Sequence, residues 1–231
     1  MNIGGFQQTS LLDYPDTISA IIWTTGCNFF CPFCYNPQLV KGEVPLIAEA
    51  EIFSFLQKRK GKLEALVISG GEPLLQPDIR TFTTKVKDLG YLVKIDTNGT
   101  RPDALKDLID HQCVDYLAMD IKAPPQKYHL LTGTTVDLDA IKRSIELLKT
   151  SGIAYELKTT VVPTLLDKQD IIAIAQWIQG STTYYLQQFK PDTTLLSPDL
   201  EQQQPYPAEY LKEIKDEIAQ YVDKCQIRGV S

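Results

Sequence analysis

Short apolar runs rich in β-branched residues recur along the chain, and each run is bounded by glycine, proline or polar residues. Runs of this length and composition are typical of strands that are buried in a sheet. The pattern predicts six strands, over residues 19–24, 65–69, 92–96, 115–120, 154–161 and 183–187.

Amphipathic segments separate these runs and predict helices over residues 48–60, 77–89, 102–109, 137–150, 167–179 and 207–222. Strands that alternate with helices form a parallel sheet. Six such units are fewer than the eight that close a full barrel. The predicted fold class is therefore α/β, a partial (β/α)6 TIM-like barrel with parallel strands, and the helix over residues 207–222 is expected to close the chain.

The chain of 231 residues suffices for one large domain, and we expect residues 1–231 to form a single one. Its five cysteines show no pattern of disulfide pairs, and we find no apolar leader segment and no apolar run of about 18 residues. We therefore expect a cytoplasmic protein without a membrane partner. The net charge of -6 disfavours nucleic acid, whose binding relies on Lys and Arg.

Three cysteines lie close together in the run TGCNFFCPFCYNP, residues 25–37. Cys27, Cys31 and Cys34 have the spacing C-x3-C-x2-C. A four-iron, four-sulfur cluster normally takes four cysteines, so three of them leave one iron open to bind another molecule. A zinc site is the alternative, although zinc usually takes four ligands and favours C-x2-C pairs.

The other candidate ligands are His111, Cys113, His129 and Cys225. His111 and Cys113 precede the predicted strand over residues 115–120, whereas the cysteine loop follows the strand over residues 19–24. In a parallel sheet these are opposite strand ends, roughly 17 Å apart for a strand of five residues. This separation favours a cluster over zinc, and Cys113 and Cys225 are interpreted as ordinary part-buried thiols.

Glycine-rich and charged residues follow the other predicted strands, at the edge where barrel enzymes build their sites. Gly70, Gly71 and Glu72 follow the second strand, where glycine lets the backbone approach a ligand and Glu72 can receive an ammonium group. Asp96 and Asp120 end the third and fourth strands, so two carboxylates are expected to converge on one pocket. Such a pair is costly unless a cation lies beside it.

The cysteine loop, with the aromatic Tyr35 after its third cysteine, resembles the cluster motif of the radical S-adenosylmethionine (SAM) superfamily. The resemblance implies a 4Fe-4S cluster whose open iron is chelated by the amino and carboxylate groups of SAM. One electron from the cluster then cleaves SAM to methionine and a 5'-deoxyadenosyl radical. The same resemblance assigns Gly70, Gly71 and Glu72 to the amino group of SAM.

Residues 96–99 (DTNG) and 120–122 (DIK) resemble elements of glycyl-radical activating enzymes that help to hold the methionyl part of SAM. The resemblance implies cofactor contacts for Asp96, Asp120 and Lys122, which a monovalent cation can join. Residues 4–15, 26–28 and 34–37 resemble the activating proteins of anaerobic (class III) ribonucleoside-triphosphate reductase.

This second resemblance implies an oxidoreductase that removes a hydrogen atom from a backbone glycine of a partner enzyme. No catalytic protein acid or base is required beyond the cluster and SAM, and an electron donor such as flavodoxin or ferredoxin is implied. The alternatives are a radical SAM enzyme that acts on a small molecule such as a deazapurine precursor, and a metal-binding or redox module without catalysis. Asp13, in the turn before the first predicted strand, is expected either to border the mouth where a glycine loop enters or to serve only its turn.

Overall fold

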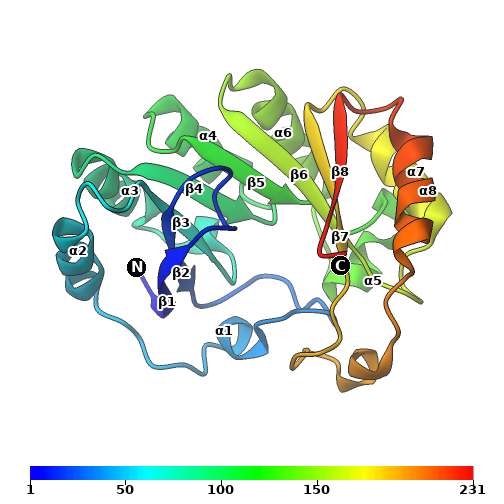
Figure 1. Ribbon diagram of the computed structural model, residues 1–231, viewed down its shortest axis with the longest axis horizontal. Coiled ribbons are helices and arrows are strands. Elements are labelled where there is room, and N and C mark those ends of the chain that lie inside the picture. Colours follow the sequence, from blue (N-terminus) through cyan, green and yellow to red (C-terminus); the bar gives the residue numbers. More distant parts are fainter. Residues whose placement is uncertain (231) are drawn as a thin grey trace.

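The computed structural model describes residues 1–230 and contains one eight-stranded sheet with the order β1-β2-β3-β4-β5-β6-β7-β8. The strands are β1 Ile3–Ser10, β2 Ser19–Thr24, β3 Ala65–Gly70, β4 Leu92–Thr97, β5 Tyr116–Asp120, β6 Ala154–Val161, β7 Thr183–Gln188 and β8 Lys224–Arg228. β1 runs antiparallel to β2, and every later neighbour is parallel. The sheet curves without closing, because β1 and β8 are its two edges (Figure 1).

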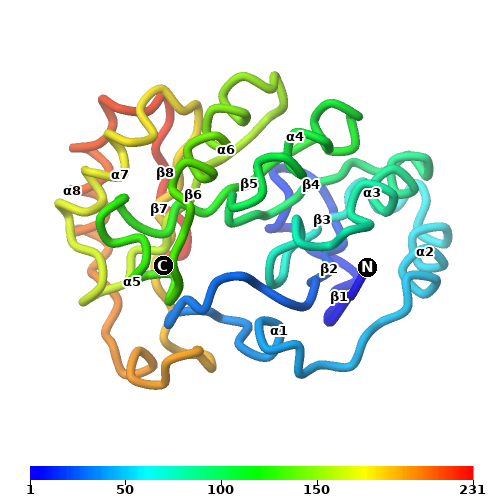
Figure 2. The backbone as a smooth tube through the Cα atoms, turned by 180° about the vertical axis from the view of Figure 1, so that it is seen from behind, coloured from blue at the N-terminus to red at the C-terminus, as the bar shows by residue number. Residues whose placement is uncertain are grey.

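Helices fill the connections between the parallel strands. They are α1 Pro37–Lys41, α2 Glu49–Lys58, α3 Ile79–Asp88, α4 Pro102–Asp110, α5 Tyr128–Thr132, α6 Leu138–Thr150, α7 Lys168–Trp177 and α8 Ala208–Ile218, with short 3-10 turns at Pro73–Leu75, Pro125–Lys127 and Pro198–Gln202. Most helices lie around the outside of the curve, whereas α1 and α5 lie beyond the C-terminal strand ends (Figure 2). No helix within residues 1–230 has the length and apolar character that crossing a membrane requires.

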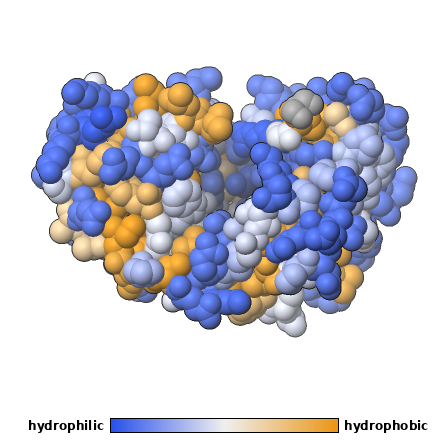
Figure 3. All heavy atoms as spheres, turned by 60° about the horizontal axis from the view of Figure 1, so that its bottom comes forward, coloured by the Kyte–Doolittle hydropathy of each residue, from blue (hydrophilic) through white to orange (hydrophobic). Residues whose placement is uncertain are grey.

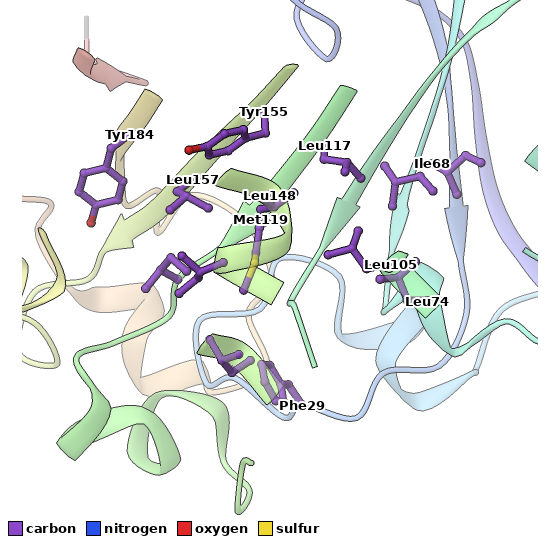
Figure 4. Packing of buried hydrophobic residues seen from close by; sticks show 14 of the residues in the cluster. Phe29, Ile68, Leu74, Leu105, Leu117, Met119, Leu148, Tyr155, Leu157 and Tyr184 are labelled. Atoms are coloured by element: carbon purple, nitrogen blue, oxygen red, sulfur yellow. The ribbon is translucent and has the colours of Figure 1, made fainter. Parts of the chain in front are cut away.

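The main core lies between the outer face of the sheet and its helices. Side chains alternate along a strand, so every second residue of the apolar runs faces this layer. Ile68, Leu117 and Leu157 are fully buried there. Figure 4 shows Leu117 and Leu157 on the same layer as Leu105 of α4 and Leu148 of α6. The inner face of the sheet carries the candidate site and a small second group of buried apolar residues.

The six predicted strands and their parallel order are confirmed, and the sheet is a partial barrel as expected. Two corrections concern its edges. The prediction missed β1 and β8, and the chain does not close on the last helix, because β8 follows α8. β1 contains Gly4 and Gly5 and buries only Ile3 and Ser10, while β8 buries no residue fully. Edge strands of this kind lack the apolar run on which the prediction rested.

A half-buried ion pair joins β8 to the rest of the sheet. The guanidinium of Arg228 donates two hydrogen bonds to Glu156 on β6, at 2.6 and 2.7 Å, and the Tyr116 hydroxyl donates a third at 3.0 Å. The Glu156 side chain is fully buried. This carboxylate therefore links three strands, β5, β6 and β8.

Replacement of Glu156 by alanine is expected to lower the free energy of unfolding by about 2 kcal/mol, because Tyr116 and the partly exposed Arg228 lose a buried acceptor. Urea unfolding measures the loss. The double variant Glu156→Leu with Arg228→Met removes both charges and is expected to recover most of the stability. A single variant as stable as the wild-type protein would contradict the role of this pair.

Candidate active site

The three cysteines of the loop between β2 and α1 line one pocket at the C-terminal edge of the sheet. Gly26, two residues after β2, adopts a positive φ of 85°, and its N-H donates to the Leu39 carbonyl of α1 at 2.8 Å. These two features turn the loop back across the strand ends. The backbone N-H of Phe29 donates to Cys27 Sγ at 3.4 Å and that of Asn36 to Cys34 Sγ at 3.5 Å. Backbone donors aimed at sulfur favour thiolate ligands over thiols.

The cysteine environment fits a metal cluster better than a free nucleophile. Burial raises the pKa of the Cys31 thiol to about 12 and that of Cys27 to about 11. A reactive thiol needs the opposite shift, whereas cysteine ligands lose their protons when a metal binds, so the raised pKa values disfavour a free nucleophile here. Within residues 1–230, no three Cys, His, Asp or Glu side chains are close enough to hold one metal ion. The three thiols line the wall of one pocket.

Gly70 and Gly71 line the same pocket, where the turn after β3 presses against the cysteine loop. The Gly71 N-H donates to the Thr24 carbonyl at 2.9 Å, and a Cβ on Gly71 would lie 2.0 Å from the carbonyl oxygen of Gly26. A Cβ on Gly70 would lie 2.3 Å from the backbone nitrogen of Thr24. Only glycine fits at these two positions, and the bare backbone is open to a ligand.

Glu72 was expected to receive an ammonium group, but its carboxylate does not line the pocket. It accepts hydrogen bonds from the Leu74 N-H at 2.9 Å, the Thr97 hydroxyl at 2.7 Å and the Asn98 N-H at 2.7 Å. Burial raises its pKa to about 7, against these three hydrogen bonds, which lower it. The side chain thus ties the glycine turn to the end of β4, and the backbone of this segment is what faces the site.

Asp96 and Asp120 do converge on the pocket, yet they are accompanied by lysines. Asp96 pairs with Lys94 at 2.8 Å and with Lys158 of β6 at 3.5 Å, while Asp120 pairs with Lys122 at 3.3 Å. Burial would raise the pKa of Asp96, but Lys158 and Lys94 outweigh it and hold the pKa well below its usual range. The Asp96 carboxylate therefore remains ionised, and both carboxylates lie beside ammonium groups of the chain itself.

Tyr35 lines the pocket and also joins the cysteine loop to the segment after β7. Its hydroxyl accepts a hydrogen bond from the Lys190 N-H at 3.0 Å, and nearby the Ser197 N-H donates to the Pro32 carbonyl at 2.8 Å. On the other side, the Asn98 amide donates to the Asn28 side chain at 2.9 Å. Hydrogen bonds from the segment after β7 and from the end of β4 thus hold the cysteine loop in place.

Asp13 is not brought to this pocket. Ser10 pairs with Ser19, so the loop between β1 and β2 lies at the N-terminal end of β2, opposite the cysteine loop. The Asp13 carboxylate accepts a hydrogen bond from the Ser10 hydroxyl, and its carbonyl accepts one from Lys94 Nζ at 2.7 Å. The prediction that Asp13 borders the mouth of the pocket assumed a course for the chain before β2. The antiparallel strand β1 instead places this loop at the N-terminal end of β2, away from the pocket.

Sequence reasoning also missed Lys158, which lines the pocket with Ser69, Thr160 and Gln187 from three strand ends. A signal was present: Lys158 is a lone lysine within the otherwise apolar or neutral end of β6. Lys94 in β4 is a second lysine of this kind. A charged side chain at an inward position of a buried strand indicates a polar interior.

The comparisons with known proteins agree with this geometry. The model of the Radical SAM superfamily matches residues 21–178. A protein of Methanocaldococcus jannaschii, named provisionally as a glycyl-radical enzyme activating enzyme, is 34% identical over 236 residues, covering 99% of this chain and 96% of the relative. The pyruvate formate-lyase-activating enzyme of Clostridium pasteurianum is 28% identical over 188 residues, covering 77% and 76%.

Among solved structures, Streptococcus suis SuiB bound to the precursor peptide SuiA has a TM-score of 0.70 at 15% identity over 90% of this chain. The chain spans about half of SuiB, 48% of its length, and the likeness concerns the fold. The cysteine loop, the partial barrel and the matching model together show that the chain belongs to the radical SAM superfamily. Within it, the chain groups with the glycyl-radical enzyme activating enzymes.

Proposed function

We propose that the protein holds a 4Fe-4S cluster and SAM, cleaves SAM reductively and removes a hydrogen atom from a backbone glycine of a partner glycyl-radical enzyme. The observation that carries the proposal is one pocket in which the three cysteines face Gly70, Gly71 and the strand-end carboxylates. Anaerobic ribonucleoside-triphosphate reductase is the proposed partner, with flavodoxin or ferredoxin as electron donor. The near full-length similarity to a relative named for glycyl-radical enzyme activation supports this class of partner.

In this proposal, the residues of the chain bind the cluster and SAM and orient them. Cys27, Cys31 and Cys34 hold the cluster, which supplies the electron for SAM cleavage when bound. Gly70 and Gly71 let the backbone approach the amino end of SAM. No side chain needs to move a proton, because the hydrogen leaves the glycine as an atom.

An open-sided sheet supports a protein as the substrate. β1 and β8 form separate edges, and the space-filling view toward the C-terminal strand ends shows a hollow between two halves of the molecule (Figure 3). A partner segment that enters this hollow would itself close the site to water. A small substrate would leave the hollow open, which disfavours the deazapurine alternative.

Anaerobic incubation with SAM, a reductant and the candidate reductase tests the proposal. Electron paramagnetic resonance is expected to show a glycyl radical in the partner only when all components are present. SAM cleavage without a radical in the partner would favour a small-molecule substrate. A reduced, cluster-loaded protein that leaves SAM intact would point to a binding or redox module instead.

We propose that Asp13 serves the turn between β1 and β2, because it lies at the opposite strand end from the pocket and accepts a hydrogen bond from Ser10 within its own loop. Asp13→Ala is therefore expected to lower the melting temperature while glycyl-radical formation and uncoupled SAM cleavage stay near the wild-type rate. Ser10→Ala is the matched variant, because it removes the same hydrogen bond and keeps the carboxylate. An Asp13→Ala protein that forms the glycyl radical about tenfold more slowly, with SAM cleavage unchanged, would instead favour a contact between Asp13 and the partner.

A further inference from the structure

Two exposed apolar side chains lie together where the cysteine loop meets α5. Phe30 of the loop is 51% exposed, and Leu130 of α5 is 58% exposed. The Phe30 N-H donates to the Thr132 carbonyl at 2.7 Å, and a Cβ on Gly133 would lie 3.3 Å from Phe30 Cβ. Leu130 lies one turn before Gly133, on the same face of the helix. Phe30 and Leu130 therefore form one surface patch at the contact between the loop and α5, the Phe30–Leu130 patch (Figure 2).

The patch adjoins the cysteine ligands but lies outside the pocket. Phe29 and Cys31, the neighbours of Phe30 in the chain, both line the pocket, whereas Phe30 does not. In the proposed function, SAM fills the pocket and the partner segment fills the hollow at its mouth. A further protein can therefore approach Cys31 through this patch while the mouth is occupied.

The charge around the patch differs from that of the whole chain, whose net charge is -6. The segments that adjoin it, residues 25–36, 97–102 and 121–136, contain no Asp or Glu, but they contain one Arg, two Lys and one His. The Asn28 amide donates to the Thr100 hydroxyl at 2.9 Å, which brings the exposed Arg101 close to the loop. The two lysines pair with aspartates, whereas Arg101 has no ion-pair partner within residues 1–230. An apolar centre beside an uncompensated positive charge is complementary to an acidic protein.

We propose that the Phe30–Leu130 patch is the docking site of an acidic electron-carrier protein that reduces the cluster. The carrier is oxidised by one electron, which the cluster accepts, and no bond forms or breaks and no proton moves. Electron-transfer encounters use small interfaces, so two exposed apolar side chains suffice as their centre. This inference rests on the proposed function, because only a protein that holds the cluster requires a donor.

The test compares two reductants of the anaerobic, cluster-loaded protein, flavodoxin and photoreduced 5-deazaflavin, a small molecule that needs no docking surface. The absorbance of the cluster gives both rates, and titration calorimetry gives the dissociation constant of flavodoxin. Phe30→Ser and Leu130→Ser are each expected to slow reduction by flavodoxin about tenfold and to weaken its binding by a similar factor. Reduction by deazaflavin is expected to stay within about twofold of the wild-type rate.

Leu12→Ser is the control, because Leu12 is 91% exposed but lies in the loop between β1 and β2, at the opposite strand end. It is expected to keep the wild-type rate and affinity with flavodoxin. Reduction of the wild-type protein by flavodoxin is also expected to slow as ionic strength rises. Iron content and melting temperature verify that each variant keeps its cluster and fold, and Leu130→Ser probes the patch without altering the cysteine loop.

Equal rates and affinities with flavodoxin in the wild-type, Phe30→Ser and Leu130→Ser proteins would overturn the inference. Slower glycyl-radical formation in both variants when deazaflavin supplies the electrons would also overturn it, because the patch would then bind the glycyl-radical enzyme. A wild-type protein that leaves SAM intact after reduction by deazaflavin would instead refute the proposed function, so the two failures are distinguishable.

Discussion

Cys31→Ala is expected to abolish both cluster binding and SAM cleavage. Cys31 is the most buried of the three loop cysteines, and its thiol lies in the pocket that Cys27 and Cys34 also line. With two thiolates remaining, two irons of a four-iron cluster would lack a protein ligand, and no other cysteine lies on this pocket. Iron and sulfide analysis after anaerobic reconstitution measures the loss, together with the rate of 5'-deoxyadenosine formation.

Cys113→Ala is the matched control for this experiment. Cys113 is equally a buried thiol, but it lies before β5, at the opposite strand end from the cysteine loop, and contacts the Thr84 hydroxyl at 3.2 Å. We expect this variant to keep its cluster and its SAM cleavage, and the same holds for Cys225→Ala on β8. A Cys113→Ala protein that loses the cluster as completely as Cys31→Ala would contradict a site with three cysteine ligands.

Gly71→Ala is expected to lower the rate of SAM cleavage about a hundredfold, because a displacement near 1 Å in an active site has effects of this size. The added Cβ would lie 2.0 Å from the Gly26 carbonyl oxygen and 3.3 Å from the Cys27 nitrogen. Both are backbone atoms, so the cysteine loop must move away from the glycine turn. Cleavage kinetics and the iron content of the reconstituted variant measure the consequence.

Gly61→Ala separates this clash from the general cost of replacing a glycine. Gly61 has a positive φ of 76°, which disfavours alanine, but a Cβ there would meet nothing within 4 Å. We expect this control to lose about 1 kcal/mol of stability and to cleave SAM at the wild-type rate. Equal cleavage rates in the Gly71 and Gly61 variants would show that the close approach of the two loops is unimportant.

The predictable part of the fold is the part with a buried apolar pattern. The strands β2 to β7 pack against helices on their outer face and therefore carry buried apolar runs. The strand bounds predicted from these runs lie within one residue of the observed ends. β1 and β8 lie at the edges and depend on backbone pairing with one neighbour each. β8 is also held by the Glu156–Arg228 ion pair, which joins residues 72 positions apart. Long-range contacts of this kind leave no local pattern in the sequence.

The candidate site also has a part that could be predicted from the sequence and a part that could not. Short motifs at strand ends placed the three cysteines, Gly70, Gly71 and the two aspartates on one edge, and the structure brings them to one pocket. The direction of the Glu72 side chain was not predictable, because it depends on donors from Thr97 and Asn98 on the neighbouring strand. The location of Asp13 depended on an edge strand that the pattern does not indicate.

Isotope transfer tests most directly whether this protein is a glycyl-radical activase. The partner enzyme is prepared with deuterated glycine and incubated anaerobically with SAM, a reductant and the cluster-loaded protein, and the 5'-deoxyadenosine formed is analysed by mass spectrometry. Abstraction from a backbone glycine predicts one deuterium in this product, and its loss when the target glycine of the partner is replaced by alanine. Product that forms at full rate without deuterium would contradict a glycine of the partner as the hydrogen donor.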